Sequence, residues 1–117
     1  MFFLVVFVLN DPNLSIDLLD AWEAAGIRGV TILESSGLGR VRISGMRDDL
    51  PLMPGLSDLF KSTEARHRTL FSVVRSQDQV NAIVEATQSV VGDLEQENTG
   101  LLFVLPVSQV YGSSKLA

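Results

Sequence analysis

The pattern of apolar and polar residues along the chain predicts four β-strands. Residues 2–9 are apolar at every position, which is typical of a central strand covered on both faces. Residues 27–36 and 66–75 each divide into two sets of alternating side chains, one set for each face of a strand. Residues 101–105 are again apolar throughout, and we expect Pro106 to end this last strand.

Two segments between these strands have helical spacing. The first contains apolar residues at every third or fourth position, which are Leu14, Leu18, Trp22 and Ala25. Gly26 follows at the usual C-terminal position of a helix. The second covers residues 76–91, and we expect the Ser76 hydroxyl to cap its first turn. Its apolar stripe consists of Val80, Ile83, Val84, Thr87, Val90 and Val91.

The order of these elements predicts the fold class. Two helices of this size cover one face of a four-stranded antiparallel sheet, so we expect an α+β, ferredoxin-like βαββαβ sandwich that forms a single domain over residues 1–117. The other face of the sheet would be open, although residues 2–9 and 101–105 are apolar on both sides. An exposed apolar face favours self-association with closed symmetry. We therefore predict an oligomer whose subunits pack their sheets together.

Composition narrows the functional classes. The 117 residues include no cysteine, which removes a disulfide framework, a thiolate metal site and a cysteine nucleophile. No serine–histidine–aspartate order or phosphate loop can be assembled, so we do not expect an enzyme. The apolar start is far shorter than the ~20 residues of a membrane span. It also lacks the basic region and cleavage site of a signal peptide, so we expect a cytoplasmic protein without membrane insertion.

Positive charge is concentrated in the middle of the chain. The net charge is −5, but residues 40–68 carry six Lys and Arg against four Asp and Glu. This excess is too small for a nucleic-acid partner. It favours a small anion, or an acidic patch on a partner protein. His67 is the only histidine and lies between two arginines, so we expect no metal site there.

The segment 41–65 separates the second and third predicted strands and has no sustained period. A loop of this length is typically functional. We expect its apolar residues to dock on a partner, and the candidates are Leu52, Met53, Leu56, Leu59 and Phe60. The alternative is a short helix that packs on the body of the same chain.

A motif at the end of the second predicted strand offers candidate ligand contacts. Gly37 and Gly39 permit a turn, or the close approach of a ligand to the backbone. Arg40 can pair bidentately with a phosphate or carboxylate. The hydroxyls of Thr31 and Ser36 are further candidate donors. The alternative is a strand end with turn glycines and a solvated arginine.

This motif and two segments later in the chain resemble a known family. Residues 29–40, GVTILESSGLGR, are similar to the GMTVTEVKGFGR signature of the PII signal-transduction proteins. The shared positions are Gly29, Thr31, Glu34, Gly37, Gly39 and Arg40. Residues 100–107, GLLFVLPV, resemble the family segment GKIFVLPV, and residues 66–86 have the pattern of its third strand and second helix.

The resemblance implies a ferredoxin-like homotrimer with nucleotide-sized sites between subunits. The family's T-loop, which docks on transporters, enzymes or regulators, would correspond to residues 41–65. Its phosphate-wrapping B-loop would correspond to residues 92–100, with Gly92, Asp93 and Gly100 as ligand contacts. The implied ligand is an adenine nucleotide or another small anion.

Several positions depart from the family pattern. Leu101 replaces the lysine after the last B-loop glycine, and Glu95 and Glu97 lie where phosphate would meet repulsion. The C-terminal segment retains only Lys115 as a basic residue, and the 41–65 segment has no tyrosine to be uridylylated. The chain therefore resembles a divergent PII-like protein.

Two hypotheses follow. In the first, a trimeric regulator binds a small anion between subunits and controls a partner through residues 41–65. In the second, a ligand-free interaction or scaffold trimer kept the fold and lost nucleotide binding. A third candidate, a metal-handling trimer like the CutA copper-tolerance family, is disfavoured by the absence of cysteine and the single histidine.

Overall fold

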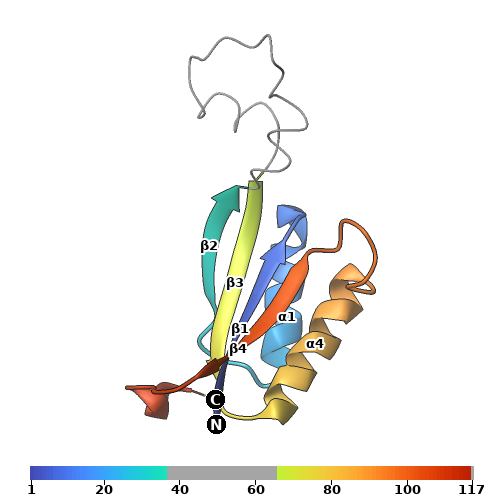
Figure 1. The fold of residues 1–117 in the computed structure, drawn as a ribbon. Helices are drawn as coiled ribbons and strands as arrows, with labels where there is room; N and C mark the ends of the chain where they lie inside the picture. Colours follow the sequence, from blue (N-terminus) through green and yellow to red (C-terminus); the bar gives the residue numbers. More distant parts are fainter. Residues whose placement is uncertain (37–65, 117) are drawn as a thin grey trace, which may run out of the picture.

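In a computed structural model of the protein, which describes residues 1–36 and 66–116, four strands form one antiparallel sheet (Figure 1). The main elements are β1 (Phe2–Leu9), α1 (Ser15–Ala24), β2 (Thr31–Ser36), β3 (Arg66–Val74), α4 (Gln77–Val91) and β4 (Leu101–Val107). The strand order is β2-β3-β1-β4, and both helices lie on the same face of the sheet. The predicted ferredoxin-like arrangement is confirmed.

The core lies between the helices and one face of the sheet. In β1 every second residue from Val5 to Leu9 is buried, and the register places Val5 and Phe7 opposite Ser72 and Leu70 of β3. The helices contribute the buried apolar residues Leu18, Trp22, Val80 and Ile83. Val74 of β3 and Ile27, which follows α1, complete the buried apolar set. The helical stripes predicted from the sequence therefore face the sheet, as expected from their spacing.

A buried hydrogen bond joins the two helices. Trp22 and Thr87 are both 0% exposed, and Trp22 Nε1 donates to Thr87 Oγ1 over 2.9 Å. The Thr87 hydroxyl in turn donates to the Ile83 carbonyl over 2.7 Å. The polar atoms that these side chains carry into the core are thus satisfied, which avoids the cost of an unpaired buried donor.

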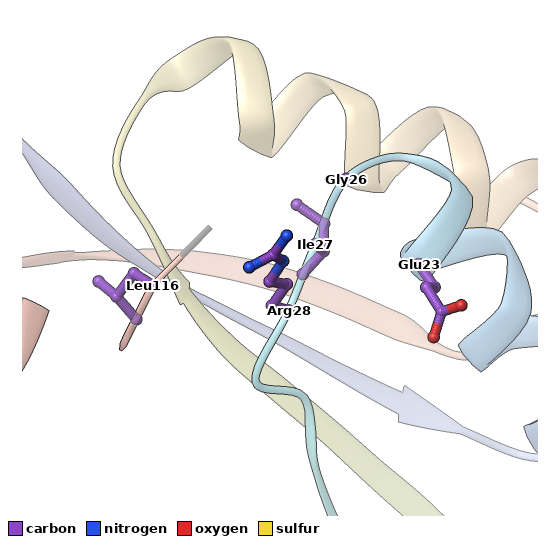
Figure 2. Close-up of a pocket in the computed structure, with 5 residues that line it drawn as sticks. All are labelled: Glu23, Gly26, Ile27, Arg28 and Leu116. Atoms are coloured by element: carbon purple, nitrogen blue, oxygen red, sulfur yellow. The ribbon is translucent and has the colours of Figure 1, made fainter. Parts of the chain in front are cut away.

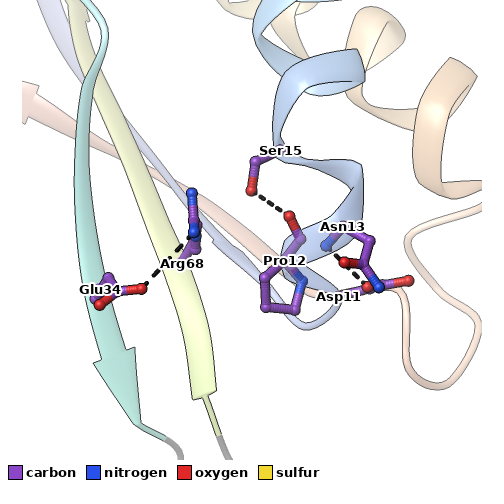
Figure 3. A network of polar contacts seen from close by, with 6 residues as sticks. All are labelled: Asp11, Pro12, Asn13, Ser15, Glu34 and Arg68. Carbon is purple, nitrogen blue, oxygen red and sulfur yellow. Dashed lines mark hydrogen bonds and ion pairs between the residues drawn. The ribbon is translucent and has the colours of Figure 1, made fainter.

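Local polar contacts define the helix ends. A short 3₁₀ helix, Pro12–Leu14, precedes α1; Asp11 Oδ1 accepts from Asn13 N over 3.0 Å, and Ser15 Oγ donates to the Pro12 carbonyl over 2.6 Å (Figure 3). Ser76 caps α4, because its hydroxyl accepts from Gln79 N over 3.2 Å, as predicted.

Two predicted strand boundaries were wrong. The second strand begins at Thr31 rather than 27, because Gly26 (φ +90) and Gly29 (φ +68) bend the connection out of the extended conformation. The last strand continues through Pro106 to Val107. Proline is tolerated there because β4 lies at the edge of the sheet and pairs only with β1.

The face of the sheet opposite the helices is apolar and has no cover within the described chain. The register groups Val6, Phe71 and Phe103 on it, with Leu4 and Leu105 alongside. The most exposed large members of this face are Leu33 at 53%, Leu101 at 62%, Phe103 at 41% and Leu105 at 46%. The prediction of an open apolar face is confirmed for the single chain.

Removal of the buried hydroxyl should destabilise the core. Thr87→Val keeps the side-chain shape but leaves the Trp22 N–H buried without its acceptor, so we expect a loss of about 1–3 kcal/mol in the free energy of unfolding. Urea denaturation followed by the fluorescence of Trp22, the only tryptophan, measures the loss. Thr87→Ser retains the hydroxyl and should lose less; equal losses would show that the hydrogen bond contributes nothing.

Candidate functional site

The central segment leaves and re-enters the fold at the ends of β2 and β3. Ser36, the last residue of β2, pairs in register with Arg66, the first of β3. Two parts of the predicted site, Gly37 to Arg40 and the apolar residues at 52–60, lie outside the described residues. The described part of the predicted site is its base, where β2 ends and β3 begins.

An ion pair lies on the helix side of this base. Arg68 Nη2 is 3.7 Å from Glu34 Oε1, and the register places the two residues directly opposite each other (Figure 3). Their side chains are 37% and 72% exposed, so solvent screens the attraction. The sequence alone did not identify this pair, because it depends on the register between β2 and β3.

Hydroxyl groups occupy the opposite face of the same base. Ser35 Oγ and Thr69 Oγ1 are 3.0 Å apart and share a hydrogen bond between β2 and β3. Thr31, a predicted ligand contact, is exposed and pairs with Phe71 at the other end of β2. Thr31 therefore lies five residues along the strand from Ser36, or about 16 Å.

The loop 92–100 is closed by its own hydrogen bonds. Leu94 N donates to Gln88 Oε1 over 3.1 Å, Glu95 N donates to Asp93 Oδ1 over 2.9 Å, and Gln96 N donates to the Asp93 carbonyl over 3.0 Å. Three consecutive backbone donors are thus engaged, one by the Gln88 side chain of α4 and two by Asp93 within the loop. Because a phosphate-binding loop presents free N–H groups to its ligand, this conformation does not offer one at residues 94–96.

Further contacts fix the same loop. The Thr99 hydroxyl lies 2.8 Å from the Gln96 carbonyl and 3.3 Å from that of Leu94, and Leu94 packs against the hydrophobic core. The carboxylate-bearing residues Glu95 and Glu97 are exposed. The predicted contact Asp93 therefore has a structural role in this conformation, as an acceptor for two residues of its own loop.

Two glycines bound this loop, and they differ in their surroundings. Gly92 (φ +92) ends α4 and has open space where a Cβ would project. Gly100 (φ +105) precedes β4, and a Cβ there would lie 2.5 Å from the Val8 carbonyl oxygen and 2.7 Å from the Phe7 ring. Gly100 is therefore required by close packing against β1 as well as by its backbone conformation.

The predicted ligand contacts lie at opposite edges of the sheet. Thr31 and Ser36 belong to β2, whereas residues 92–100 lead into β4, and β3 and β1 separate these two strands. Three strand spacings correspond to about 14 Å. The two groups do not meet within one chain.

Two adjoining hollows lie elsewhere, along the connection from α1 to β2. They share Glu23, Ile27 and Arg28 as lining residues, and none of the predicted ligand contacts lines them. Within the described ranges, no group of three histidine, aspartate or glutamate side chains is arranged to hold a metal ion. None of the described helices is long and apolar enough to span a membrane.

Substitution of the two loop glycines should separate backbone strain from packing. Gly92→Ala meets only the strain of a backbone conformation (φ +92, ψ −171) that is essentially restricted to glycine, about 1–3 kcal/mol. Gly100→Ala adds the clash with β1, so we expect a total loss of about 2–5 kcal/mol in the free energy of unfolding. Urea denaturation of both variants measures the difference, and equal losses would contradict the close approach of Gly100 to β1.

Comparison with known proteins identifies the family. The model of the nitrogen regulatory protein P-II family matches residues 4–115. A search of curated protein sequences gave no significant match. GlnK of B. subtilis has a similar structure, with a TM-score of 0.59 and 18% sequence identity over 92% of this chain and 85% of that one. PII of Arabidopsis thaliana bound to citrate has a TM-score of 0.62 and 22% identity over 92% of this chain and 78% of that one. The match over nearly the whole sequence shows that the chain belongs to the nitrogen regulatory protein P-II family.

Proposed function

We propose that this protein is a trimeric, cytoplasmic regulator that binds a small anionic metabolite or nucleotide between subunits. The bound anion changes residues 41–65, which control a partner protein such as a transporter or an enzyme. Membership of the P-II family carries the proposal, because proteins of this family are signalling regulators and generally not enzymes. Neither nucleic acid nor the membrane interior is a partner in this scheme.

The open apolar face supports the proposed trimer. Leu101, Phe103 and Leu105 are each more than 40% exposed in the single chain and lie on one face of one strand. Complete burial of such a side chain contributes about 1.5–3 kcal/mol relative to full exposure, and a partial gain from each of these residues favours association. A closed ring of subunits would cover the face without leaving another exposed.

The separation of the predicted contacts supports a site between subunits. Thr31 and Ser36 lie on the β2 edge of the sheet, and Gly92, Asp93 and Gly100 lie beside the β4 edge. A ligand of nucleotide size reaches both groups if the β2 edge of one copy lies beside the β4 edge of the next. In this arrangement Gly37 and Gly39 line the cleft, and Arg40 supplies the positive charge.

The loop 92–100 bears on the chemical class of the ligand. Its donors at 94–96 are engaged and its exposed side chains include Glu95 and Glu97, so contact with a polyphosphate there is disfavoured. The relative from Arabidopsis thaliana was solved with citrate, a polycarboxylate. We therefore include carboxylates with adenine nucleotides among the candidate anions.

The same loop favours one alternative function. A trimer that retained the fold and lost the ligand would act as an interaction or scaffold protein. The self-bonded loop and Leu101, which is 62% exposed at the start of β4, are the observations that favour it. Such a protein would bind its partner regardless of metabolites.

Calorimetric titration with ATP, ADP, AMP, cyclic AMP and citrate, with and without magnesium, tests the ligand-sensing proposal. We expect saturable binding of at least one anion. Arg40→Ala should weaken it about 10- to 100-fold, since a charge-assisted contact is lost. Arg47→Ala removes an equal charge from the same segment and should have a smaller effect. Absence of binding by every anion would overturn the sensor and leave the scaffold.

A charge on the open face should prevent assembly. Leu105→Glu places a carboxylate in the proposed subunit interface, which costs several kcal/mol when it is buried without a partner. We expect the wild type to sediment as a trimer and Leu105→Glu as a folded monomer. Ala24→Glu adds the same charge to the exposed side of α1 and should remain trimeric. A monomeric wild type, or a trimeric Leu105→Glu, would contradict the assembly.

A further inference from the structure

The two hollows beside α1 share residues and form one groove, which is lined by both apolar and charged residues. Leu19 and Val30 are half-buried and Ile27 is buried, and together they lie beneath Asp20 and Glu23 of α1. Figure 2 shows the hollow that extends to Leu116, where the Arg28 side chain lies between Leu116 and Glu23. The groove is thus built by α1, the connection to β2 and the C-terminal segment of one chain.

The walls of the groove are held in place by hydrogen bonds. Ser72, which is 2% exposed, donates through Oγ to the Arg28 carbonyl over 3.2 Å and fixes the α1–β2 connection to β3. At the far end, Arg75 Nη2 donates to the Ser113 carbonyl, which also accepts from Leu116 N over 3.1 Å. The groove is therefore formed before any partner binds, which lowers the entropic cost of docking.

An exposed aliphatic side chain of α1 lies beside the groove. Ile16, Leu19, Asp20 and Glu23 have the spacing i, i+3, i+4, i+7, so they form one stripe on the helix. Ile16 is 71% exposed. Ile16 lines neither hollow, but it lies one turn before Leu19 on this stripe and is suited to anchor a partner side chain beside the groove.

The helical layer around the groove is uniformly acidic. The sequences of α1 and α4 and the loop 92–100 contain eight aspartates and glutamates and no lysine, arginine or histidine. Arg28 is the exception; it lines both hollows together with Glu23, and no described residue forms an ion pair with it. A partner with positive charge along α1 is complementary to this surface. A carboxylate or carbonyl group of the partner can accept hydrogen bonds from Arg28.

We propose that this groove docks a basic amphipathic segment of a second protein, with apolar side chains on Ile16, Leu19 and Val30 and lysine or arginine beside Asp20 and Glu23. The stripe from Ile16 to Glu23 spans about 10 Å, which accommodates two turns of a helix. Another copy of the same helical layer is excluded as the occupant by like charge. The residues named for this surface lie outside the segment 41–65 in the sequence, so the proposal adds a docking site to the one in the proposed function.

Fluorescence anisotropy with a labelled synthetic helix of leucine and lysine tests the proposal on the full-length protein. We expect saturable binding, and no binding of a leucine–glutamate helix. Asp20→Asn/Glu23→Gln should weaken binding about five- to tenfold, because two favourable charge pairs are lost. Ile16→Ser should weaken it about tenfold through lost apolar burial.

A matched pair of variants distinguishes the groove from general attraction. Asp78→Asn/Glu85→Gln removes the same charge from α4, outside the groove, and should change the affinity less than about twofold. Equal weakening by both double variants, or no effect of Ile16→Ser, would overturn the proposal in favour of non-specific attraction. A change of sedimenting species in Asp20→Asn/Glu23→Gln would also overturn it, because the occupant would then be a second copy. None of these results depends on ligand binding between subunits.

Discussion

The structure depends on the need to cover both faces of one strand. β1 lies inside the sheet and is apolar at every position from Phe2 to Leu9. The helices bury the face of β1 that contains Val5 and Phe7. The backbone of β1 pairs with β3 on one side and with β4 on the other. The other face is only half-buried by its neighbours, so the same strand that organises the core also directs the chain toward association.

The helical side of the fold is held by a few specific polar contacts within this apolar frame. The bond from Trp22 to Thr87 fixes α1 against α4, and the bond from Ser72 to the Arg28 carbonyl fixes the start of the α1–β2 connection. Each places a polar group in the core only where a partner satisfies it. As a result, the described residues of the acidic outer surface and its groove are held in a defined arrangement.

The sequence was sufficient to predict the helices and strands because the pattern of apolar residues differs clearly between these segments and the turns that separate them. The stripe at 76–91 has a helical period, whereas the run at 2–9 is apolar throughout and has the length of a buried strand. The family likeness at 29–40 agreed with the order of these elements. The predicted start of the second strand at 27 and the predicted end of the last strand at 105 were wrong, because these boundaries depend on positive φ angles and on which strand lies at the edge. The closed loop at 92–100 could not be predicted either, since its bonds depend on side-chain positions that no periodicity specifies.

The placement of the predicted ligand contacts couples assembly to ligand binding in the proposed trimer. Residues of the β2 edge and of the loop 92–100 meet only when two copies lie side by side, so the separated chain lacks a complete site. A ligand that binds only the assembled form stabilises it by mass action, and weaker assembly lowers the apparent affinity for the ligand. The α1 groove is built from one chain and has no such dependence. Under these two proposals, a partner bound in the groove would stay attached whether or not the clefts are occupied, whereas the central segment would respond to the ligand. With both surfaces, the protein would hold one partner constantly in the α1 groove. The ligand would regulate a second contact, which the protein makes through residues 41–65.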